Sequence, residues 1–222
     1  MIFNKKSQPA PGCLAIEKGK ANGTYNCAEV VQRIRIDFKN KCYLCEDKEP
    51  HSINIEHFQP HRGDNDLKFE WNNLFYCCHH CNNTKLAIPK YDLILNCTVE
   101  EDAVETKLKY HINPWPKEKV QITSLVAEVK VQNTADLLID VYNGTTIQKN
   151  IESANIRSKL LKEIRLFQDL LFKYYDDTYS DEENREIKEN IIRLLRPTSG
   201  FTAFKKWVLR DGELSEEFAE YL

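Results

Sequence analysis

The chain has 222 residues, of which 41% are hydrophobic and 29% charged, a composition typical of a globular protein and not of a disordered or fibrous one. Its net charge of −3 gives the molecule no overall field that attracts a polyanion, so nucleic-acid binding would need a local basic surface or a partner. No apolar run reaches the roughly 18 residues of a membrane span and no signal-like stretch opens the chain, so we expect a cytoplasmic protein without membrane contact.

Basic residues gather near the start of the chain, and acidic residues gather near its end. The acidic ones fall in 176–184 and 216–222. The basic ones are Lys5, Lys6, Lys18, Lys20, Arg33, Arg35, Lys39 and Lys41. A solvated surface and a binding face explain this mild asymmetry equally well.

The first predicted elements are an irregular arm and one helix. Residues 1–28 are interrupted by prolines and glycines, which favour loops. Val30, Ile34 and Phe38 then recur at helical spacing and predict a helix before the first cysteine pair. Further on, the β-prone runs 121–131 and 137–144 predict two strands, the second ending in an Asn-Gly turn.

The last third of the chain is predicted to be helical. Apolar residues form one stripe at three- or four-residue intervals, which indicates core or a partner interface: Ile156, Leu160, Ile164, Phe167, Leu171 and Tyr174. A second helix is expected over 183–195, ending before Pro197, and a short third helix should bury Phe201, Phe204 and Trp207. We therefore divide the chain into an N-terminal arm and helix (1–41), a central core (42–116) and a mainly helical C-terminal region (117–222), which could contact a partner.

The eight cysteines point to metal binding, because a reducing cytosol disfavours disulfides. Cys42 and Cys45 form one C-x2-C pair, and Cys78 and Cys81 form another. Two such pairs supply the four thiolates of a closed structural zinc site. The alternative is buried thiols that pack as small hydrophobic groups. The neighbouring Cys77, His79 and His80 leave the ligand set open.

The segment between the two pairs suggests hydrolytic chemistry. A β-prone run ends in Glu56-His57, and Asn82 directly follows the second pair. A bare zinc ribbon needs none of these side chains. A phosphodiesterase needs a metal held by oxygen ligands and a base that deprotonates water.

The pattern C-x2-C, I-E-H-F-x-P, W-x-N-L-x3-C-x2-C-N-x2-K over residues 42–85 resembles the HNH endonucleases. It is especially similar to the HNH subunit of Septu-type bacterial anti-phage systems. The resemblance implies an α+β fold, with a zinc-stapled ββα-metal core followed by a mostly helical region. It also implies a nuclease that works with an ABC/SMC-like ATPase subunit on nucleic acid, with DNA the favoured substrate.

The resemblance also implies roles for individual residues. Glu56 matches the acidic metal ligand, and His57 matches the general base. Asn73 matches the central asparagine, which fixes the loop and orients the base, and Asn82 matches a second metal ligand. Oxygen ligands of this kind suit Mg²⁺ or Mn²⁺ as the catalytic ion.

Three further residues are candidates for contacts with the phosphate. Lys85 matches a recurrent lysine near the phosphate. For His61 and Arg62, a contact with the phosphate backbone and a solvated loop position suit the sequence equally well. Two other classes of function stay open: a non-catalytic zinc adaptor that binds nucleic acid or protein, and a nuclease scaffold that has lost its activity. Only the set of Glu56, His57, Asn73 and Asn82 favours the nuclease.

Overall fold

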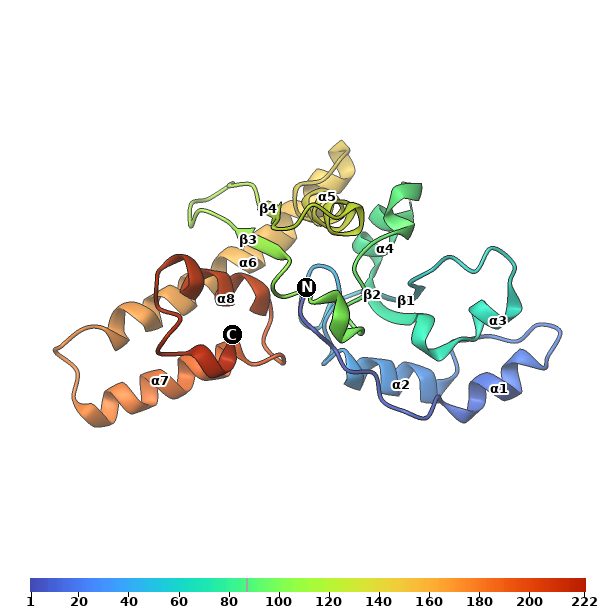
Figure 1. Cartoon of the computed structure of the whole chain (residues 1–222), viewed down its shortest axis with the longest axis horizontal. Coiled ribbons are helices and arrows are strands. Elements are labelled where there is room, and N and C mark those ends of the chain that lie inside the picture. Colours follow the sequence, from blue (N-terminus) through green and yellow to red (C-terminus); the bar gives the residue numbers. More distant parts are fainter. Residues whose placement is uncertain (87) are drawn as a thin grey trace.

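The computed structural model describes residues 1–86 and 88–222 and has a mixed α+β architecture with two small antiparallel sheets (Figure 1). No helix in these residues is both long enough and apolar enough to cross a membrane. The strands are β1 (Ile53–His57), β2 (Leu74–Cys78), β3 (Leu108–His111) and β4 (Gln121–Ser124). The α-helices are α1 (Gly12–Lys18), α2 (Ala28–Asp37), α3 (Asn65–Lys68), α4 (His79–Leu86), α5 (Val129–Asn143), α6 (Ile147–Tyr174), α7 (Asp181–Leu195) and α8 (Thr202–Asp211). Short 3-10 helices cover Trp71–Asn73, Pro89–Asp92, Glu100–Asp102 and Ala219–Tyr221.

A β-hairpin followed by a helix occupies the middle of the chain. Strand β1 pairs antiparallel with β2 in a register that sets His57 opposite Leu74 and Ile53 opposite Cys78. Helix α4 begins directly after β2, so the second cysteine pair straddles the junction of strand and helix. All five residues of β2 are buried, because α2 and α4 both pack against it.

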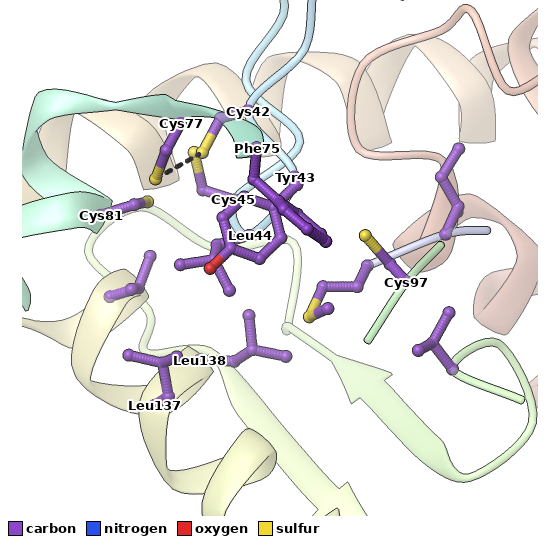
Figure 2. Close-up of a cluster of buried hydrophobic side chains, with 14 of the residues drawn as sticks. Cys42, Tyr43, Leu44, Cys45, Phe75, Cys77, Cys81, Cys97, Leu137 and Leu138 are labelled. Carbon is purple, nitrogen blue, oxygen red and sulfur yellow. Dashed lines mark hydrogen bonds between the residues drawn. The ribbon is translucent and has the colours of Figure 1, made fainter. Parts of the chain in front are cut away.

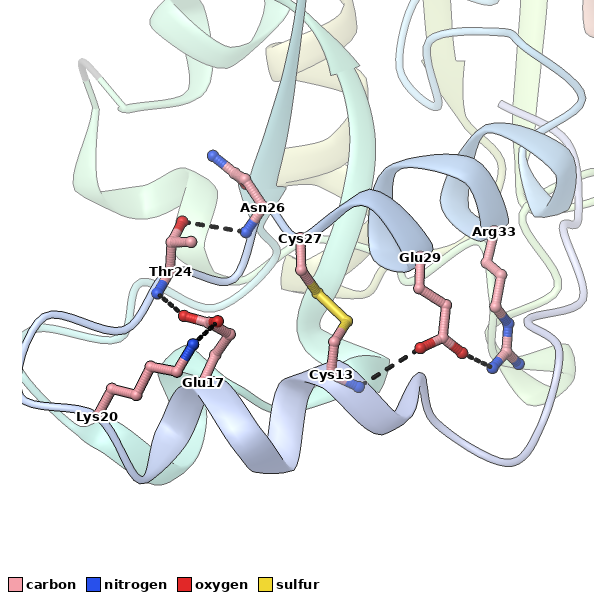
Figure 3. Close-up of a disulfide and its surroundings, with 8 residues drawn as sticks. All are labelled: Cys13, Glu17, Lys20, Thr24, Asn26, Cys27, Glu29 and Arg33. Atoms are coloured by element: carbon pink, nitrogen blue, oxygen red, sulfur yellow. Dashed lines mark hydrogen bonds and ion pairs between the residues drawn. A yellow bond between two sulfur atoms is a disulfide. The ribbon is translucent and has the colours of Figure 1, made fainter.

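The predicted helix before the first cysteine pair is confirmed as α2, which buries Val30 and Ile34. The arm before it is less irregular than predicted, because it contains helix α1. A disulfide joins Cys13 in α1 to Cys27 at the start of α2 (Figure 3). The prediction that no cysteine is disulfide-bonded is therefore wrong for this pair. A reducing compartment makes disulfides uncommon in general, but it does not exclude one between two cysteines that the packing of two short helices brings together.

The prediction of a strand over 137–144 is wrong, because this run lies inside helix α5. Its buried residues include Val131, Ala135, Leu138 and Tyr142, which recur at helical intervals. A short apolar run does not by itself distinguish a buried strand from a buried helix, and here the helical period extends further upstream. Gly144, at a φ of +75°, ends the helix. Of the run 121–131, only Gln121–Ser124 is a strand, and it pairs with β3.

The predicted C-terminal helices are confirmed as α6, α7 and α8. The stripe that begins at Ile156 lies on α6 and packs within the chain, against α5, α7 and α8. It is therefore core and is not available as a partner interface. Phe201 and Phe204 are buried as expected, while Trp207 is only partly buried.

Replacement of Leu160 by alanine tests this assignment of the stripe. Leu160 is fully buried on α6, so Leu160→Ala is expected to lower the free energy of unfolding by about 2–5 kcal/mol. The matched control is Leu166→Ala on the same helix, where the side chain is 49% exposed and a change within about 0.5 kcal/mol is expected. Urea unfolding measures both variants, and equal effects would contradict the assignment.

One large hydrophobic core joins the three regions into which the sequence was divided. Its buried members range from Ile2 through Phe75 to Phe204. A smaller cluster around Phe167 and Ile191 closes the far end of α6 and α7. The boundaries at 41/42 and 116/117 thus do not separate independent cores.

Several cations of the N-terminal basic cluster point into the protein. Lys6 donates hydrogen bonds to the backbone carbonyls of Trp71 and Leu74, and burial lowers the pKa of Lys6 to about 7. Lys41 is also buried and donates to the carbonyl of Ser199. The cluster is therefore no continuous basic surface.

Candidate functional site

Four cysteines form a buried cluster that can hold a zinc ion. The sulfur atoms of Cys42, Cys45, Cys78 and Cys81 all lie within 4.8 Å of one another, and all four residues are buried. Figure 2 shows three of them, Cys42, Cys45 and Cys81. A tetrahedral ion with Zn–S distances of about 2.3 Å places its sulfur ligands about 3.8 Å apart. The Sγ atoms of Cys45 and Cys78 are 3.9 Å apart, which matches this geometry. The residues present therefore fit a closed structural site.

Tight turns bring the two cysteine pairs together. In the first, the amide of Cys42 donates to the carbonyl of Asp47, and the amide of Glu46 donates to the carbonyl of Cys42. In the second, the amide of Cys81 donates to the sulfur of Cys78 at 3.5 Å. Amide donors of this kind stabilise the thiolate form, which is the form that binds metal.

The C-terminal helix α8 is fastened to the first cysteine turn. The amide of Ala203 donates to the Glu46 carboxylate at 3.3 Å, and Lys41 lies 3.6 Å from the same carboxylate. Both Glu46 and Lys41 are 2% exposed. Because these contacts join residues far apart in the sequence, the fold of the cysteine turn and the docking of α8 depend on each other.

Cys77 is a fifth buried thiol beside the cluster. Its sulfur lies 3.9 Å from that of Cys42 (Figure 2). Burial raises the pKa of the Cys77 thiol well above its usual value, so this side chain is a neutral S–H group. Among the described residues, the group that meets the spacing of a metal site contains the other four cysteines and excludes Cys77.

The two histidines of the second pair point to other partners. The ring of His79 contacts the Asn83 side chain through Nε2 at 2.9 Å. His80 lies between the carbonyl of Val141, 2.8 Å from Nε2, and the carboxylate of Glu152, 2.6 Å from Nδ1. These contacts resolve the alternative ligand sets in favour of the four cysteines.

Glu56 forms a buried ion pair with Lys85. The ammonium of Lys85 lies 2.6 Å from Glu56 Oε1, and the Tyr43 hydroxyl donates to the same oxygen at 3.1 Å. Both charged side chains are 1% exposed. Burial raises the pKa of Glu56, and the charge of Lys85 opposes that shift. The other carboxylate oxygen, Oε2, has no hydrogen-bond partner among the described residues.

This ion pair is expected to be structural. Lys85→Met leaves the buried charge of Glu56 without its partner, so we expect it to lower the free energy of unfolding by about 3–5 kcal/mol. Arg62→Ala is the control, because it breaks an exposed pair with Asp92 and should cost less than about 1 kcal/mol. Urea unfolding of both variants checks this. A stable Lys85→Met protein that has lost nucleic-acid cleavage would instead support the contact with phosphate that the resemblance implies.

His57 is positioned by a backbone carbonyl. Its Nε2 lies 2.9 Å from the carbonyl oxygen of Lys68, which can only accept, so Nε2 carries the proton. Nδ1 is then the acceptor nitrogen of the neutral ring. The rings of Tyr25 and His61 pack against the imidazole with centroids at 4.4 and 4.7 Å. Burial lowers the pKa of His57 below its usual 6.5, which favours the neutral form near pH 7.

Asn73 fixes the loop that carries this carbonyl. Its side chain accepts from the amide of Gln59 at 2.7 Å and donates to the carbonyls of Gln59 and Leu67 at 2.9 and 3.1 Å. Its own carbonyl accepts from the amide of Phe58 at 2.8 Å. Asn73 thus ties together both ends of the loop between β1 and α3, beside the peptide that orients His57.

The remaining candidate residues are not gathered into one site. Glu56 and His57 are neighbours on a strand, so their side chains leave opposite faces of the hairpin. Asn82 is partly buried on α4 and makes no side-chain hydrogen bond to the described part of the chain. Arg62 is paired with Asp92 at 2.5 Å, and Lys85 is enclosed against Glu56.

Sequence reasoning did not identify the partners that set these environments. Tyr43, which bonds Glu56, lies inside the first cysteine pair and could have been considered from its position alone. The carbonyl of Lys68 has no sequence signal, because every residue carries one. Tyr25 reaches His57 from the N-terminal arm, a contact that depends on the packing of α1 and α2.

Comparisons of the chain with protein-family models, with curated proteins and with solved structures returned no match. The resemblance to HNH endonucleases consequently depends on the motif residues alone.

Proposed function

We propose that the chain is a zinc-stapled HNH-type nuclease, with a ββα core made of β1, β2 and α4, that hydrolyses phosphodiester bonds in nucleic acid, with DNA as the favoured substrate. The observation that carries this proposal is the state of His57. A backbone carbonyl fixes its tautomer, burial keeps it neutral, and Nδ1 is left as an acceptor. A general base must be neutral and must present an acceptor nitrogen, and the hydrogen bond to the carbonyl fixes which nitrogen that is.

In the proposed reaction, Nδ1 of His57 takes a proton from a water molecule. The water oxygen attacks phosphorus while the bond from phosphorus to the 3′-oxygen breaks. The leaving oxygen takes a proton from solvent, and the products are a 5′-phosphate and a 3′-hydroxyl. Asn73 acts as a positioning residue, because it holds the loop that orients the base.

The surroundings of Glu56 do not fit the Mg²⁺ or Mn²⁺ that the resemblance implies. The Glu56 side chain is 1% exposed, and one of its carboxylate oxygens faces an ammonium at 2.6 Å, a charge that repels a cation. Its side chain also leaves the strand on the face opposite His57. We therefore assign no step of the reaction to an ion held by Glu56 and Asn82.

The buried pair of Glu56 and Lys85 is also the observation that favours the second candidate, a zinc adaptor that binds nucleic acid or protein without cleaving it. Nicking of supercoiled plasmid, measured with and without Mg²⁺ or Mn²⁺, separates the two functions. Nicking that His57→Ala abolishes supports the nuclease. A zinc-loaded, folded protein that does not nick DNA supports the adaptor.

Association with an ABC/SMC-like ATPase, and a role in anti-phage defence, are proposals that come from the resemblance. The buried α6 stripe does not serve that association, so the interface must use other residues. Ile147 and Ile151 are candidates, because they are 86% and 63% exposed and lie one turn apart on α6. Size measurements on the chain co-expressed with its operon neighbour test the association.

A further inference from the structure

Two cavities are lined by residues of α6. This helix extends away from α1 and α3 (Figure 1). The first, of about 460 Å³, is lined by residues of α6, by Arg193 of α7 and by the segment before α8. The second, of about 490 Å³, lies between α6 and the segment Pro114–Glu118. Lys162 lines both cavities, so they adjoin at the surface of α6, and we call the two together the α6 groove.

The helical period explains why three cations of α6 share this groove. Lys159, Lys162 and Arg165 follow one another at three-residue intervals, and each step turns about 60° around the helix axis and rises about 4.5 Å. Lys159 therefore faces the first cavity and Arg165 the second, while Lys162 stands on the ridge between them. The side chains of these three residues therefore place positive groups along the whole width of the groove.

The groove concentrates positive charge in a chain whose net charge is −3. Its acidic members are Asp47, Glu118 and Glu163. Its basic members are Lys48, Lys117, Arg157, Lys159, Lys162, Arg165 and Arg193. The groove therefore has an excess of cations over carboxylates, unlike the chain as a whole.

Two of the three carboxylates in the groove are neutralised by internal partners. Asp47 pairs with Lys159 at 2.7 Å, and Glu163 pairs with the fully buried Lys205 at 2.6 Å. Five exposed cations of the groove make no ion pair with any residue in the ranges 1–86 and 88–222: Lys48, Lys117, Lys162, Arg165 and Arg193. These five are free to bind an anionic ligand.

An exposed tryptophan stands at the edge of the second cavity. Trp115 is 64% exposed and lies between two prolines that also line the cavity. Cations that follow a phosphate backbone, beside an aromatic ring on which a base can stack, are the combination used to bind single strands. An acidic peptide would be attracted by the same cations, but only its occasional aromatic residues could stack on Trp115, whereas every nucleotide of a strand carries a base.

We propose that the α6 groove binds single-stranded nucleic acid, with its cations on the phosphates and Trp115 against a base. A third cavity of about 520 Å³ shares Lys159 with the groove and extends to Cys78 and His79 beside the zinc cluster. The bound strand can therefore continue from α6 toward the hairpin. The proposal concerns binding and holds whether or not the chain cleaves the strand.

Fluorescence anisotropy of a labelled oligothymidine of about 20 nucleotides tests the proposal. The measurement uses the full, zinc-loaded chain without added divalent ions and over a series of salt concentrations. Lys162→Ala combined with Arg165→Ala is expected to weaken binding at least tenfold. It should also lower the slope of log affinity against log salt by about 1.4, because each single-strand contact contributes about 0.7. The matched control is Lys173→Ala, an exposed cation on the same helix that lines neither cavity, and its affinity should stay within twofold.

Trp115 supplies the second arm of the test. Trp115→Ala is expected to weaken binding at least fivefold, and Trp115→Phe should retain most of the affinity, because stacking needs only an aromatic face. Unchanged affinity in the double variant would overturn the proposal. The proposal would also be overturned if a duplex bound as tightly as the single strand and Trp115→Ala had no effect on binding. The same holds if polyglutamate of equal charge displaced the bound strand. His57→Ala should bind as wild type does, so a failure of the nuclease proposal and a failure of this one give different results.

Discussion

Replacement of Cys81 by alanine is expected to abolish zinc binding and unfold the centre of the protein. Cys81 lies in the first turn of α4 and is one of the four buried thiols of the cluster. Structural zinc contributes about 10–16 kcal/mol of apparent binding free energy at neutral pH, which equals or exceeds the whole stability of a typical domain. Elemental analysis and thermal unfolding measure the two losses, and removal of zinc with a chelator should reproduce both.

Two other buried cysteines serve as controls for this prediction. Cys77 lies beside the cluster and Cys97 lies elsewhere in the core, and neither belongs to the group of four. Cys77→Ala and Cys97→Ala should keep one zinc per chain and lose only the stability of a small buried side chain. A metal-free protein with an unchanged melting temperature would contradict the structural role of zinc. Equal zinc loss in Cys77→Ala and Cys81→Ala would contradict the assignment of ligands.

Unfolding of the cysteine cluster should spread well beyond residues 42–81. The Tyr142 hydroxyl of α5 donates to the carbonyl of Cys45 at 2.7 Å. Helix α8 is attached to the same turn through Glu46. The cluster therefore holds the C-terminal helices in place as well as the hairpin, and a single cooperative transition is expected when zinc is removed.

The four-cysteine cluster was predictable because two C-x2-C turns constrain their sulfurs locally, and only the approach of the two turns depended on the fold. Helices α2, α6 and α7 were predictable for a similar reason, since their apolar periods are long. Helix α5 was not predictable, because its apolar run is also compatible with a strand. The residues on either side of the run determine which of the two forms. The disulfide of Cys13 with Cys27 was missed, because its two cysteines meet only once α1 packs on α2.

The candidate site was less predictable than the fold. The motif identifies Glu56 and Lys85 but not that they meet, and their contact depends on α4 lying against β1. The sequence also left open where free positive charge lies, because the N-terminal cluster suited a solvated surface and a binding face equally well. Lys6 and Lys41 belong to the N-terminal cluster yet are buried, whereas the exposed cations that adjoin one another, such as Lys162, lie on α6. The positions of charged residues along a sequence do not show which side chains are buried and hydrogen-bonded within the protein.

His57→Ala is expected to reduce plasmid nicking by about 10²–10⁴-fold, the usual contribution of a general base. The fold and the zinc content should not change, because His57 is only half-buried and the one side-chain hydrogen bond that it makes within residues 1–86 and 88–222, to the carbonyl of Lys68, is local. The matched control is His61→Ala, which removes a ring of the same type that packs against His57. We expect this control to lose less than tenfold.

The pH dependence of nicking provides an independent test of the same base. Burial lowers the pKa of His57 below its usual 6.5, and only the neutral ring can accept a proton on Nδ1. Nicking should therefore rise as the pH increases, with the midpoint of the rise below pH 6.5. The pKa of His57 is lower in the folded state than in the unfolded state. The contribution of neutral His57 to stability is therefore lost as the pH falls below the pKa of the unfolded state. A midpoint above pH 7, or near-normal nicking by His57→Ala, would exclude His57 as the base and leave the zinc adaptor as the better description.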